Sequence, residues 1–209
     1  MTRWEFTPYN IVEWNNSSER ILFVAAEPNG EQPNGGNYDM GEWFRTAKQY
    51  NNFHNNERFF RRSEIILTGI LNGENIDDVF GCFRFMDLKA TSGCAKSDLS
   101  EIESYVIDNF NEVIKYFNST DEKFGLSPHI IVLLGNPAQS IFKRLLRPLL
   151  INNPSLQWVG MPHPSHTVDY EALAKASVEL REHLRPITDE TTDKWIYQKG
   201  NLNYWRRIP

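Results

Sequence analysis

The sequence predicts an α/β fold: a three-layer sandwich in which a central parallel sheet of about four strands carries helices on both faces. Short apolar runs alternate along the chain with longer amphipathic stretches, and this alternation is typical of parallel sheets covered on both sides. The clearest run, "HIIVLLG" (129–135), is apolar at successive positions, as expected of a strand buried on both faces. The length of 209 residues and the 40% hydrophobic content are sufficient for one domain with a sizeable core.

Four apolar runs are predicted to be the strands of this sheet. Each is short, rich in β-branched or aromatic residues, and bounded by polar residues, glycine or proline. They are "ERILFVAAEP" (19–28), "CFRFMDLKA" (82–90), "HIIVLLG" (129–135) and "LQWVGMP" (156–162). A further run, "EIILTGIL" (64–71), is compatible with either a strand or a helix, because periodicity does not separate the two in so short a stretch.

The longer stretches are predicted to be helices. Segment 99–117 carries its apolar residues on one stripe, and Asp98 is the expected N-cap. Pro137 stands at the first position of another predicted helix, where its missing N–H costs nothing. The predicted helices are 42–60, 99–117, 136–150 and 169–184, whereas "EQPNGGNYDMG" (31–41) is a loop by composition.

We expect a single domain over residues 1–209, with a core over about 20–185 and a C-terminal extension over about 186–209. No apolar run is long enough to cross a membrane, and the start "MTRWEFTPYN" lacks the apolar centre of a signal peptide. The two cysteines, Cys82 and Cys94, give neither a disulfide framework nor zinc-site spacing. These features predict a cytoplasmic monomer with free thiols, without a metal, a cofactor or a membrane partner.

The net charge of −5 argues against a nucleic-acid coat protein, which would be basic. A localised basic patch is still compatible with that charge. Its candidate cations also fit a plainer interpretation, as solvated helix faces or a solvated tail. They are Arg58/Arg61/Arg62, Lys143/Arg144/Arg147 and Arg206/Arg207.

Polar side chains follow all four predicted strands. Because ligands in open parallel sheets bind outside the carboxyl ends of the strands, these residues predict one functional site. They are Glu27-Pro28-Asn29 after the first strand, Asp87 in the second, Gly135-Asn136 after the third and His163-Pro164-Ser165 after the last.

These segments, in this order, resemble the uracil-DNA glycosylase superfamily. The first motif of that family has the form Gly-x-(Asp/Asn/Ala)-Pro-x, and Ala25-Ala26-Glu27-Pro28-Asn29 matches it in part. The second motif, His-Pro-Ser or a relative, corresponds to His163-Pro164-Ser165. Between them, "VLLGNPAQ" (132–139) is similar to the family segment Leu-Leu-x-Gly-x-x-Ala-Gln. The resemblance covers about residues 20–185, so it implies the same three-layer fold and a DNA glycosylase activity.

The resemblance implies that Glu27 and His163 are the catalytic residues. A glycosylase first extrudes the nucleotide from the base stack. A carboxylate near C1′ then stabilises an oxocarbenium-like sugar and orients water, and a donor stabilises the departing base anion. Glutamate in place of the family's Asp or Asn moves the carboxylate by about 1.5 Å, enough to misplace a catalytic group, so Asp39 is the alternative acid. Plainer interpretations are that Glu27 belongs to a turn and that His163 is packed structurally.

Asp87 stands where the uracil-specific branch has an Asn that contacts the uracil edge. A protonated Asp both donates and accepts, which suits the N3 acceptor and N4 amino donor of cytosine. Asn29 replaces a Tyr that blocks C5 substituents in uracil-specific members. Both substitutions favour a C5-modified cytosine, whereas a structural alternative pairs Asp87 with Lys89 or Arg84. Tyr38, Trp43 and Phe44 are candidates either for stacking on the flipped base or for core packing.

The resemblance also implies DNA contacts. Ser165, Asn136 and the backbone around Gly135 would hold phosphates. His166, Thr167 and Val168 would form the loop that enters the duplex where the base has left. The tail "DKWIYQKGNLNYWRRIP" (193–209) lies outside the resemblance. It either packs on the body as a strand or helix, which we favour, or stacks on nucleic acid.

The expected function is therefore a monofunctional DNA glycosylase, because the motifs contain no lysine nucleophile. Its expected partner is double- or single-stranded DNA, and its substrate is a modified or damaged pyrimidine. Hydroxymethylated or glucosylated cytosine in phage DNA would make the enzyme an antiviral defence. The alternatives are a uracil-excising repair glycosylase, a catalytically inactive module that binds modified bases, and a hydrolase of small nucleosides.

Overall fold

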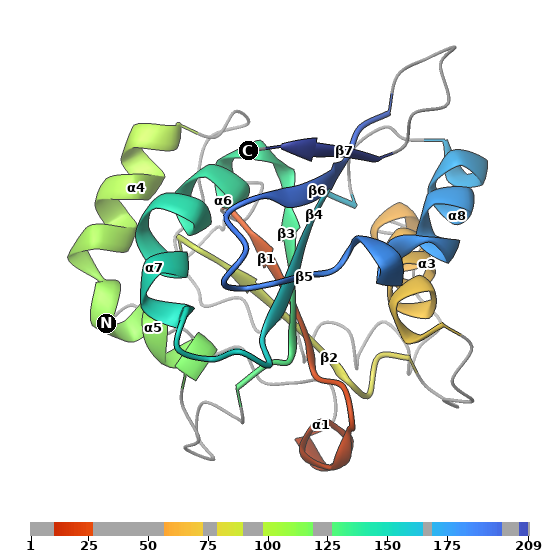
Figure 1. The fold of residues 1–209 in the computed structure, drawn as a ribbon, viewed down its shortest axis with the longest axis horizontal. Helices are drawn as coiled ribbons and strands as arrows, with labels where there is room; N and C mark the ends of the chain where they lie inside the picture. The colour runs from red at the N-terminus through yellow and green to blue at the C-terminus, as the bar shows by residue number, and fades with distance from the viewer. Residues whose placement is uncertain are drawn as a thin grey trace.

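The computed structural model describes residues 11–26, 57–72, 79–89, 98–118, 127–164, 169–197 and 205–208. Seven strands in these ranges form one sheet with the order β2-β1-β3-β4-β6-β7, and β5 pairs with β4 (Figure 1). The strands are β1 (Ile21–Ala25), β2 (Phe83–Asp87), β3 (Ile130–Leu134), β4 (Gln157–Met161), β5 (Arg185–Pro186), β6 (Thr192–Trp195) and β7 (Trp205–Ile208).

The four predicted strands are confirmed as the parallel centre of the sheet, β2-β1-β3-β4. The expected count of about four was wrong, because β5, β6 and β7 extend the sheet beyond β4. β6 is parallel to β4, whereas β5 and β7 pair antiparallel to their neighbours. These three strands are short and rich in charged residues, so hydrophobic patterning did not predict them. The described parts of the tail pack on the body as strands, as we favoured.

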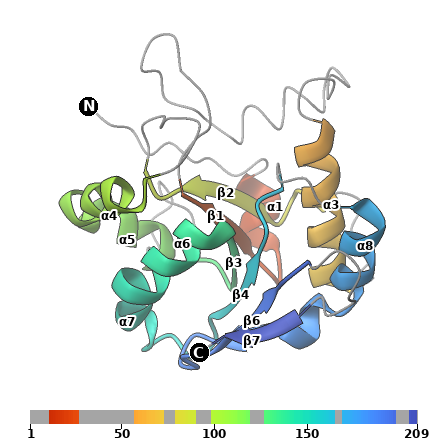
Figure 2. The same ribbon diagram turned by 90° about the horizontal axis from the view of Figure 1, so that it is seen from above.

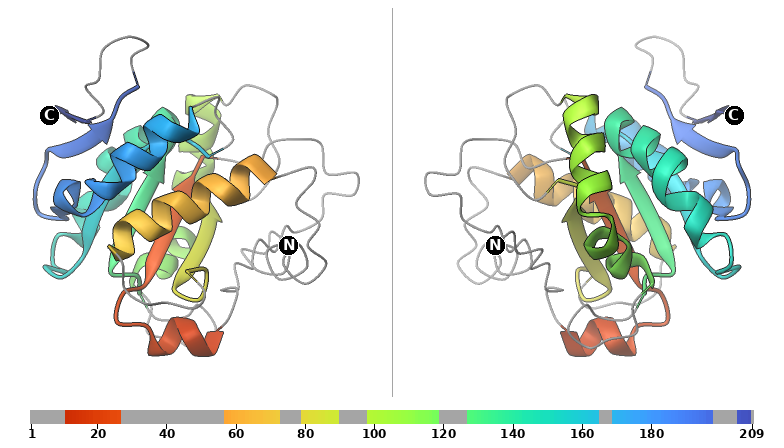
Figure 3. Two further views of the ribbon diagram at one scale, coloured as in Figure 1. Left: turned by 90° about the vertical axis from the view of Figure 1, so that its right-hand side faces the viewer. Right: turned by 90° about the vertical axis from the view of Figure 1, so that its left-hand side faces the viewer.

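Helices cover both faces of the sheet (Figures 2 and 3). One face packs against α3 and α8, and the other against α4 to α7. The helices are α1 (Ile11–Asn16), α3 (Glu57–Leu71), α4 (Leu99–Asp108), α5 (Phe110–Asn118), α6 (Gly135–Ile141), the π-helix η1 (Phe142–Leu146), α7 (Arg147–Leu150), α8 (Tyr170–Val178) and the 3₁₀-helix η2 (Leu180–His183). The three-layer α/β architecture is therefore present. Within the described residues, no helix combines the length and the apolarity needed to cross a membrane.

Strand β1 contributes side chains to both hydrophobic cores. Ile21 and Phe23 pack in the core under α3 and α8, whereas Leu22 and Val24 pack in the core under α4 to α7. Successive side chains of a strand point to opposite faces, so a continuous apolar run is required of a strand with helices on both sides.

The structure shows that the ambiguous run is helical and divides one predicted helix into two. The ambiguous run 64–71 is the second half of α3, whose buried positions Ile66, Leu67 and Ile70 recur at helical spacing. The predicted helix 99–117 is divided into α4 and α5 at Asn109. Asp98 is the N-cap of α4, as predicted, because its side chain accepts hydrogen bonds from the backbone N–H groups of Ser100 and Glu101.

The predicted helix 136–150 contains a π-helical segment, η1. Pro148 follows directly in α7, and a proline inside a helix removes one hydrogen bond and clashes with the carbonyl four residues earlier. That carbonyl belongs to Arg144, within η1, and a wider turn relieves the clash. The neighbouring Arg147 donates to the carbonyls of Ile187 and Thr188, at 2.9 and 2.8 Å, which fastens α7 to the segment before β6.

Candidate functional site

Four of the predicted site residues meet at the carboxyl edge of the parallel strands. Asp87 ends β2, Gly135 and Asn136 follow β3, and His163 lies two residues beyond β4. The register pairs Ala25, the last residue of β1, with Asp87. The other candidates lie outside the described residues: Glu27, Asn29, Tyr38, Asp39, Trp43, Phe44, Ser165, His166, Thr167 and Val168.

Asp87 faces the helical layer that contains α3. Phe85, two residues earlier on β2, belongs to that core, and alternate residues of a strand share a face. The Asp87 side chain is buried. Beyond it, the backbone N–H groups of Leu88 and Lys89 donate to the carbonyls of Ala25 and Ala26, both at 2.9 Å. The chain between β1 and Glu27 is therefore fastened directly beside Asp87.

The two cations that the sequence offered as partners for Asp87 have other contacts. The Lys89 ammonium is buried and donates to a Glu101 carboxylate oxygen at 2.5 Å. The Arg84 guanidinium lies 5.3 Å from the centre of the Trp14 ring, a cation–π arrangement. Each cation thus has a described partner other than Asp87.

His163 lies on the same side of the sheet, against Phe59 of α3. The two ring centroids are 6.0 Å apart, and Phe59 also packs edge-on against Phe85 of β2, at 5.5 Å. His163 is only partly buried. The Phe59 ring therefore lies between the ends of β2 and β4, strands that are about 14 Å apart at the usual strand spacing. Phe59 therefore links the ends of these two strands on this face of the sheet.

The residue after His163 is held by a buried arginine. Arg62 Nη1 donates to the Pro164 carbonyl at 2.8 Å, and its guanidinium lies 4.9 Å from the centre of the Tyr170 ring. Arg62 is 3% exposed, so neither interpretation offered for it, a basic patch or a solvated helix face, was right. Arg62 follows Phe59 by three residues and so lies on the apolar face of α3. This spacing was the sign in the sequence that Arg62 is buried. Through its hydrogen bond to Pro164, Arg62 positions the histidine motif.

The turn after β3 depends on Gly135 and Gln139. Gly135 has φ +80°, a left-handed conformation that other residues adopt only at a cost. The buried Gln139 amide donates to the carbonyls of Leu133 and Met161, both at 3.4 Å, and so joins the ends of β3 and β4. Gly160 makes room for this side chain, because a Cβ there would lie 2.9 Å from the amide. The sequence motif contained Gln139, but its positioning role was not predicted.

Asn136 contacts the C-terminal extension. Its side-chain oxygen accepts a hydrogen bond from Lys194 of β6, and Lys194 is opposite Gly160 of β4. Burial lowers the pKa of Lys194, since desolvation disfavours the ammonium. The extension therefore reaches the same edge of the sheet as the four core strands.

The other predicted cations are largely engaged in structural contacts. Arg144 pairs with Glu103 at 2.7 Å, and Arg147 donates to the two carbonyls before β6. Arg207 pairs with Asp193 at 3.3 Å. Arg206 is exposed and is opposite Lys194 in the β6–β7 register.

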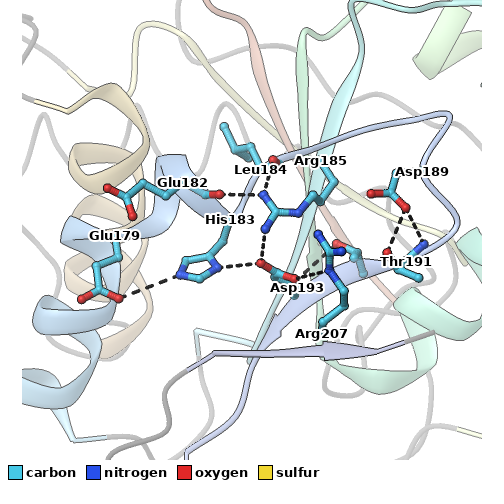
Figure 4. Close-up of polar contacts among 10 residues, drawn as sticks. Glu179, Glu182, His183, Leu184, Arg185, Asp189, Thr191, Asp193 and Arg207 are labelled. Carbon is cyan, nitrogen blue, oxygen red and sulfur yellow. Dashed lines mark hydrogen bonds and ion pairs between the residues drawn. The ribbon is translucent and has the colours of Figure 1, made fainter.

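A second histidine and aspartate meet away from this edge (Figure 4). His183 Nδ1 lies 2.8 Å from Asp193 Oδ2, and Arg185 and Arg207 also bind the Asp193 carboxylate. Burial alone raises the pKa of Asp193, but the hydrogen bonds and positive charges of His183, Arg185 and Arg207 outweigh it and lower that pKa. The His183 ring stacks on Trp205, with centroids 4.2 Å apart. This cluster fastens η2 to the β6–β7 hairpin.

The described residues contain no group of three or more His, Cys, Asp or Glu side chains that could hold a metal ion. The fold and its edge thus define a three-layer α/β protein with polar side chains at the carboxyl ends of its parallel strands. Comparisons of the chain with models of protein families, with curated proteins and with solved structures find no match.

Proposed function

We propose that this protein is a DNA glycosylase, which flips a base out of DNA and hydrolyses its N-glycosidic bond to leave an abasic site. The observation that carries the proposal is the placement of Asp87 and His163 on one face at the carboxyl edge, with the end of β1 and the Gly135 turn between them. The resemblance to the uracil-DNA glycosylase superfamily implies this same order of a base-contacting residue, a glycine turn and a catalytic histidine.

The partial burial of His163 supports its role toward the departing base. Phe59 packs against the imidazole, and Arg62 holds the following carbonyl, so the ring is oriented before a substrate arrives. A preorganised N–H donor stabilises a developing anion more effectively than mobile water does. Glu27 follows Ala26 directly and is the proposed acid near C1′, with Asp39 as the alternative.

Asp87 supports a cytosine-type base as the substrate. Its side chain is 5% exposed, so a base that reaches it leaves the solvent and gains a strengthened hydrogen bond. A carboxyl group accepts from the N4 amino group of cytosine, and Asn29 leaves room at C5 by comparison with a tyrosine. We propose hydroxymethylated or glucosylated cytosine in phage DNA as the target, and therefore an antiviral enzyme.

The test is a panel of DNA substrates followed by alkali, which cleaves DNA at abasic sites. The panel contains uracil, thymine opposite guanine, 5-methylcytosine, 5-hydroxymethylcytosine and glucosylated hydroxymethylcytosine. We expect breaks at a C5-modified cytosine that disappear in Glu27→Ala and His163→Ala proteins. Lys175→Ala, which removes an exposed ion pair on α8, is the matched control and should cleave like the unchanged protein.

The remaining outcomes identify the alternatives. Cleavage of the uracil substrate alone would support a repair glycosylase and contradict the role given to Asp87. Tight binding of modified DNA without any cleavage would support an inactive binding module. Release of bases from free nucleosides, with no preference for DNA, would support a small-nucleoside hydrolase.

A further inference from the structure

The β6–β7 hairpin carries two cations opposite each other on one face. Lys194 of β6 pairs in register with Arg206 of β7. Lys194 points toward α6, where it donates to Asn136. Its neighbours Asp193 and Trp195 point to the other face, because Trp195 belongs to the core under α3 and α8 and alternate residues of a strand share a face. Lys194 and Arg206 therefore form a cross-strand pair of like charge.

No carboxylate of the described residues forms an ion pair with Lys194 or Arg206. The adjacent Arg207, on the opposite face of β7, does pair with the Asp193 carboxylate. Like charges directly opposite each other on neighbouring strands are destabilising, and the Lys194 ammonium has also lost part of its hydration. A bound anion would turn this repulsion into attraction, so the pair has the electrostatic character of an anion site.

The pair lies at the carboxyl edge of the sheet that also carries the proposed active site, but on the opposite face of the sheet from Asp87 and His163. Lys194 is opposite Gly160, the residue before the end of β4, and β4 leads directly to His163. Asn136, which the family resemblance assigns to a DNA phosphate, contacts Lys194. Figures 1 and 2 show the hairpin extending the sheet beyond β4, on the side opposite to β2.

We propose that Lys194 and Arg206 bind a backbone phosphate of the DNA strand that carries the flipped nucleotide. The backbones of neighbouring strands are about 5 Å apart. The ammonium of Lys194 and the guanidinium of Arg206 can therefore both reach one phosphate. Arg supplies a forked pair of donors and Lys a point charge. The hairpin thus widens the DNA-binding surface beyond the core fold. The inference rests on the proposed function for the identity of its ligand.

The first test measures the salt dependence of DNA binding. A fluorescent duplex of unmodified DNA, about 20 base pairs long, is titrated with protein from about 50 to about 200 mM NaCl, where each phosphate contact contributes about one unit to the slope of log K against log salt. Lys194→Ala/Arg206→Ala should lower that slope by about one unit and weaken binding about tenfold. Lys115→Ala changes a residue of α5, a helix that lies apart from β7 in Figure 1, and should leave the slope unchanged.

The second test separates a binding role from a folding role. Arg206→Glu replaces the repulsive cross-strand pair by an attractive one. We expect it to raise the midpoint of thermal unfolding while it weakens DNA binding. Lys115→Glu gives the same change in net charge and is the control for non-specific effects of charge. A variant that merely misfolded would instead lower both the midpoint and the affinity.

The outcomes distinguish this inference from the proposed function. An unchanged slope in the double variant, with base release intact, overturns the hairpin inference alone. A reduced slope without base release from any substrate supports the hairpin inference and overturns the proposed activity. Absence of DNA binding by the unchanged protein overturns both proposals.

Discussion

Two regions of the molecule bring an aspartate and a histidine into one neighbourhood, and they differ in how the carboxylate is used. At the carboxyl edge, Asp87 and His163 come from different strands and lie on either side of the space above β1 and β3. In the cluster between η2 and the hairpin, His183 contacts Asp193 directly, and two arginines bind the same carboxylate.

The difference shows why proximity alone does not define a catalytic pair. The Asp193 carboxylate already binds two arginines and the His183 ring, and Trp205 covers the face of the His183 ring. Such a network stabilises a fixed arrangement of strands. At the carboxyl edge, helix α3 instead packs against His163 and the residue that follows it, through Phe59 and Arg62.

Replacing each of the two histidines by alanine in turn should give the largest difference between the two regions. His163→Ala should slow base release by about 100- to 1000-fold, the typical cost of losing a donor to a developing anion. His183→Ala should leave the rate within about twofold but lower the free energy of unfolding by about 1–2 kcal/mol, because it loses a charge-assisted hydrogen bond and a ring stack. Single-turnover assays and urea unfolding measure the two effects. A folded His183→Ala protein as slow as His163→Ala would contradict the distinction.

Substitutions of two adjacent arginines test the contact that holds the residue after His163. Arg61 and Arg62 both lie 4.9 Å from the Tyr170 ring centre, but only Arg62 is buried and donates to Pro164. Arg62→Ala should therefore destabilise the protein by about 2–3 kcal/mol, because the buried Pro164 carbonyl loses its donor and the removed side chain leaves a cavity. Arg61→Ala, the matched control, should cost less than about 1 kcal/mol. Equal losses in urea unfolding would show that the stacking on Tyr170, rather than the Pro164 contact, is what matters.

Removing the charge of Asp193 tests the structural cluster. Asp193→Asn should lower the free energy of unfolding by about 2 kcal/mol, less than a fully buried pair would lose, because its cationic partners are partly hydrated. Base release at a temperature where the variant is folded should be unchanged. Glu190→Gln, which removes a charge from a side chain that is 87% exposed, should change stability by less than about 0.5 kcal/mol. A larger loss for Glu190→Gln than for Asp193→Asn would contradict this assignment.

The smallest expected effect is a pH dependence of stability. The pKa of Asp193 is lowered in the folded protein, so the unfolded chain, with a carboxyl pKa near about 3.9, binds its proton first as the pH falls. The stabilising contribution is complete above about pH 5 and is lost as the pH falls through the folded pKa. Stability measured from about pH 6 to about pH 3 should fall less steeply for Asp193→Asn than for the unchanged protein. Asp98 and Asp189 also have lowered pKa values, but they are present in both proteins.

The parallel centre of the fold was predictable because each strand had a single strong signal. Ile130 to Leu134 are all buried, so an unbroken apolar run was diagnostic. The hairpin lacked that signal, since Thr192, Asp193 and Lys194 owe their positions to partners that are distant in sequence. The same limit applies to α3, where 64–71 contains enough apolar residues for either structure, and only packing against α8 and the sheet decides between them.

The candidate site was predictable where a polar residue or a glycine stands at the end of a predicted strand. Asp87, Gly135, Asn136 and His163 were found by that rule, and the structure places them along one edge. The supporting residues were not found, because an arginine within a charged helix or a glutamine after a proline carries no visible sign of burial. Arg62, Gln139 and Lys194 are recognisable only when the carbonyl or amide that each one contacts is in place.

The π-helical turn at Phe142–Leu146 also determines how the chain tolerates changes in its length. Deleting one residue from that turn would rotate the following helix by about 100°. Arg147 would then point away from the carbonyls of Ile187 and Thr188 that it now binds, and the connection into β6 would lose its fastening. A change in the length of this helix would therefore also shift the segment that leads into β6 and Lys194.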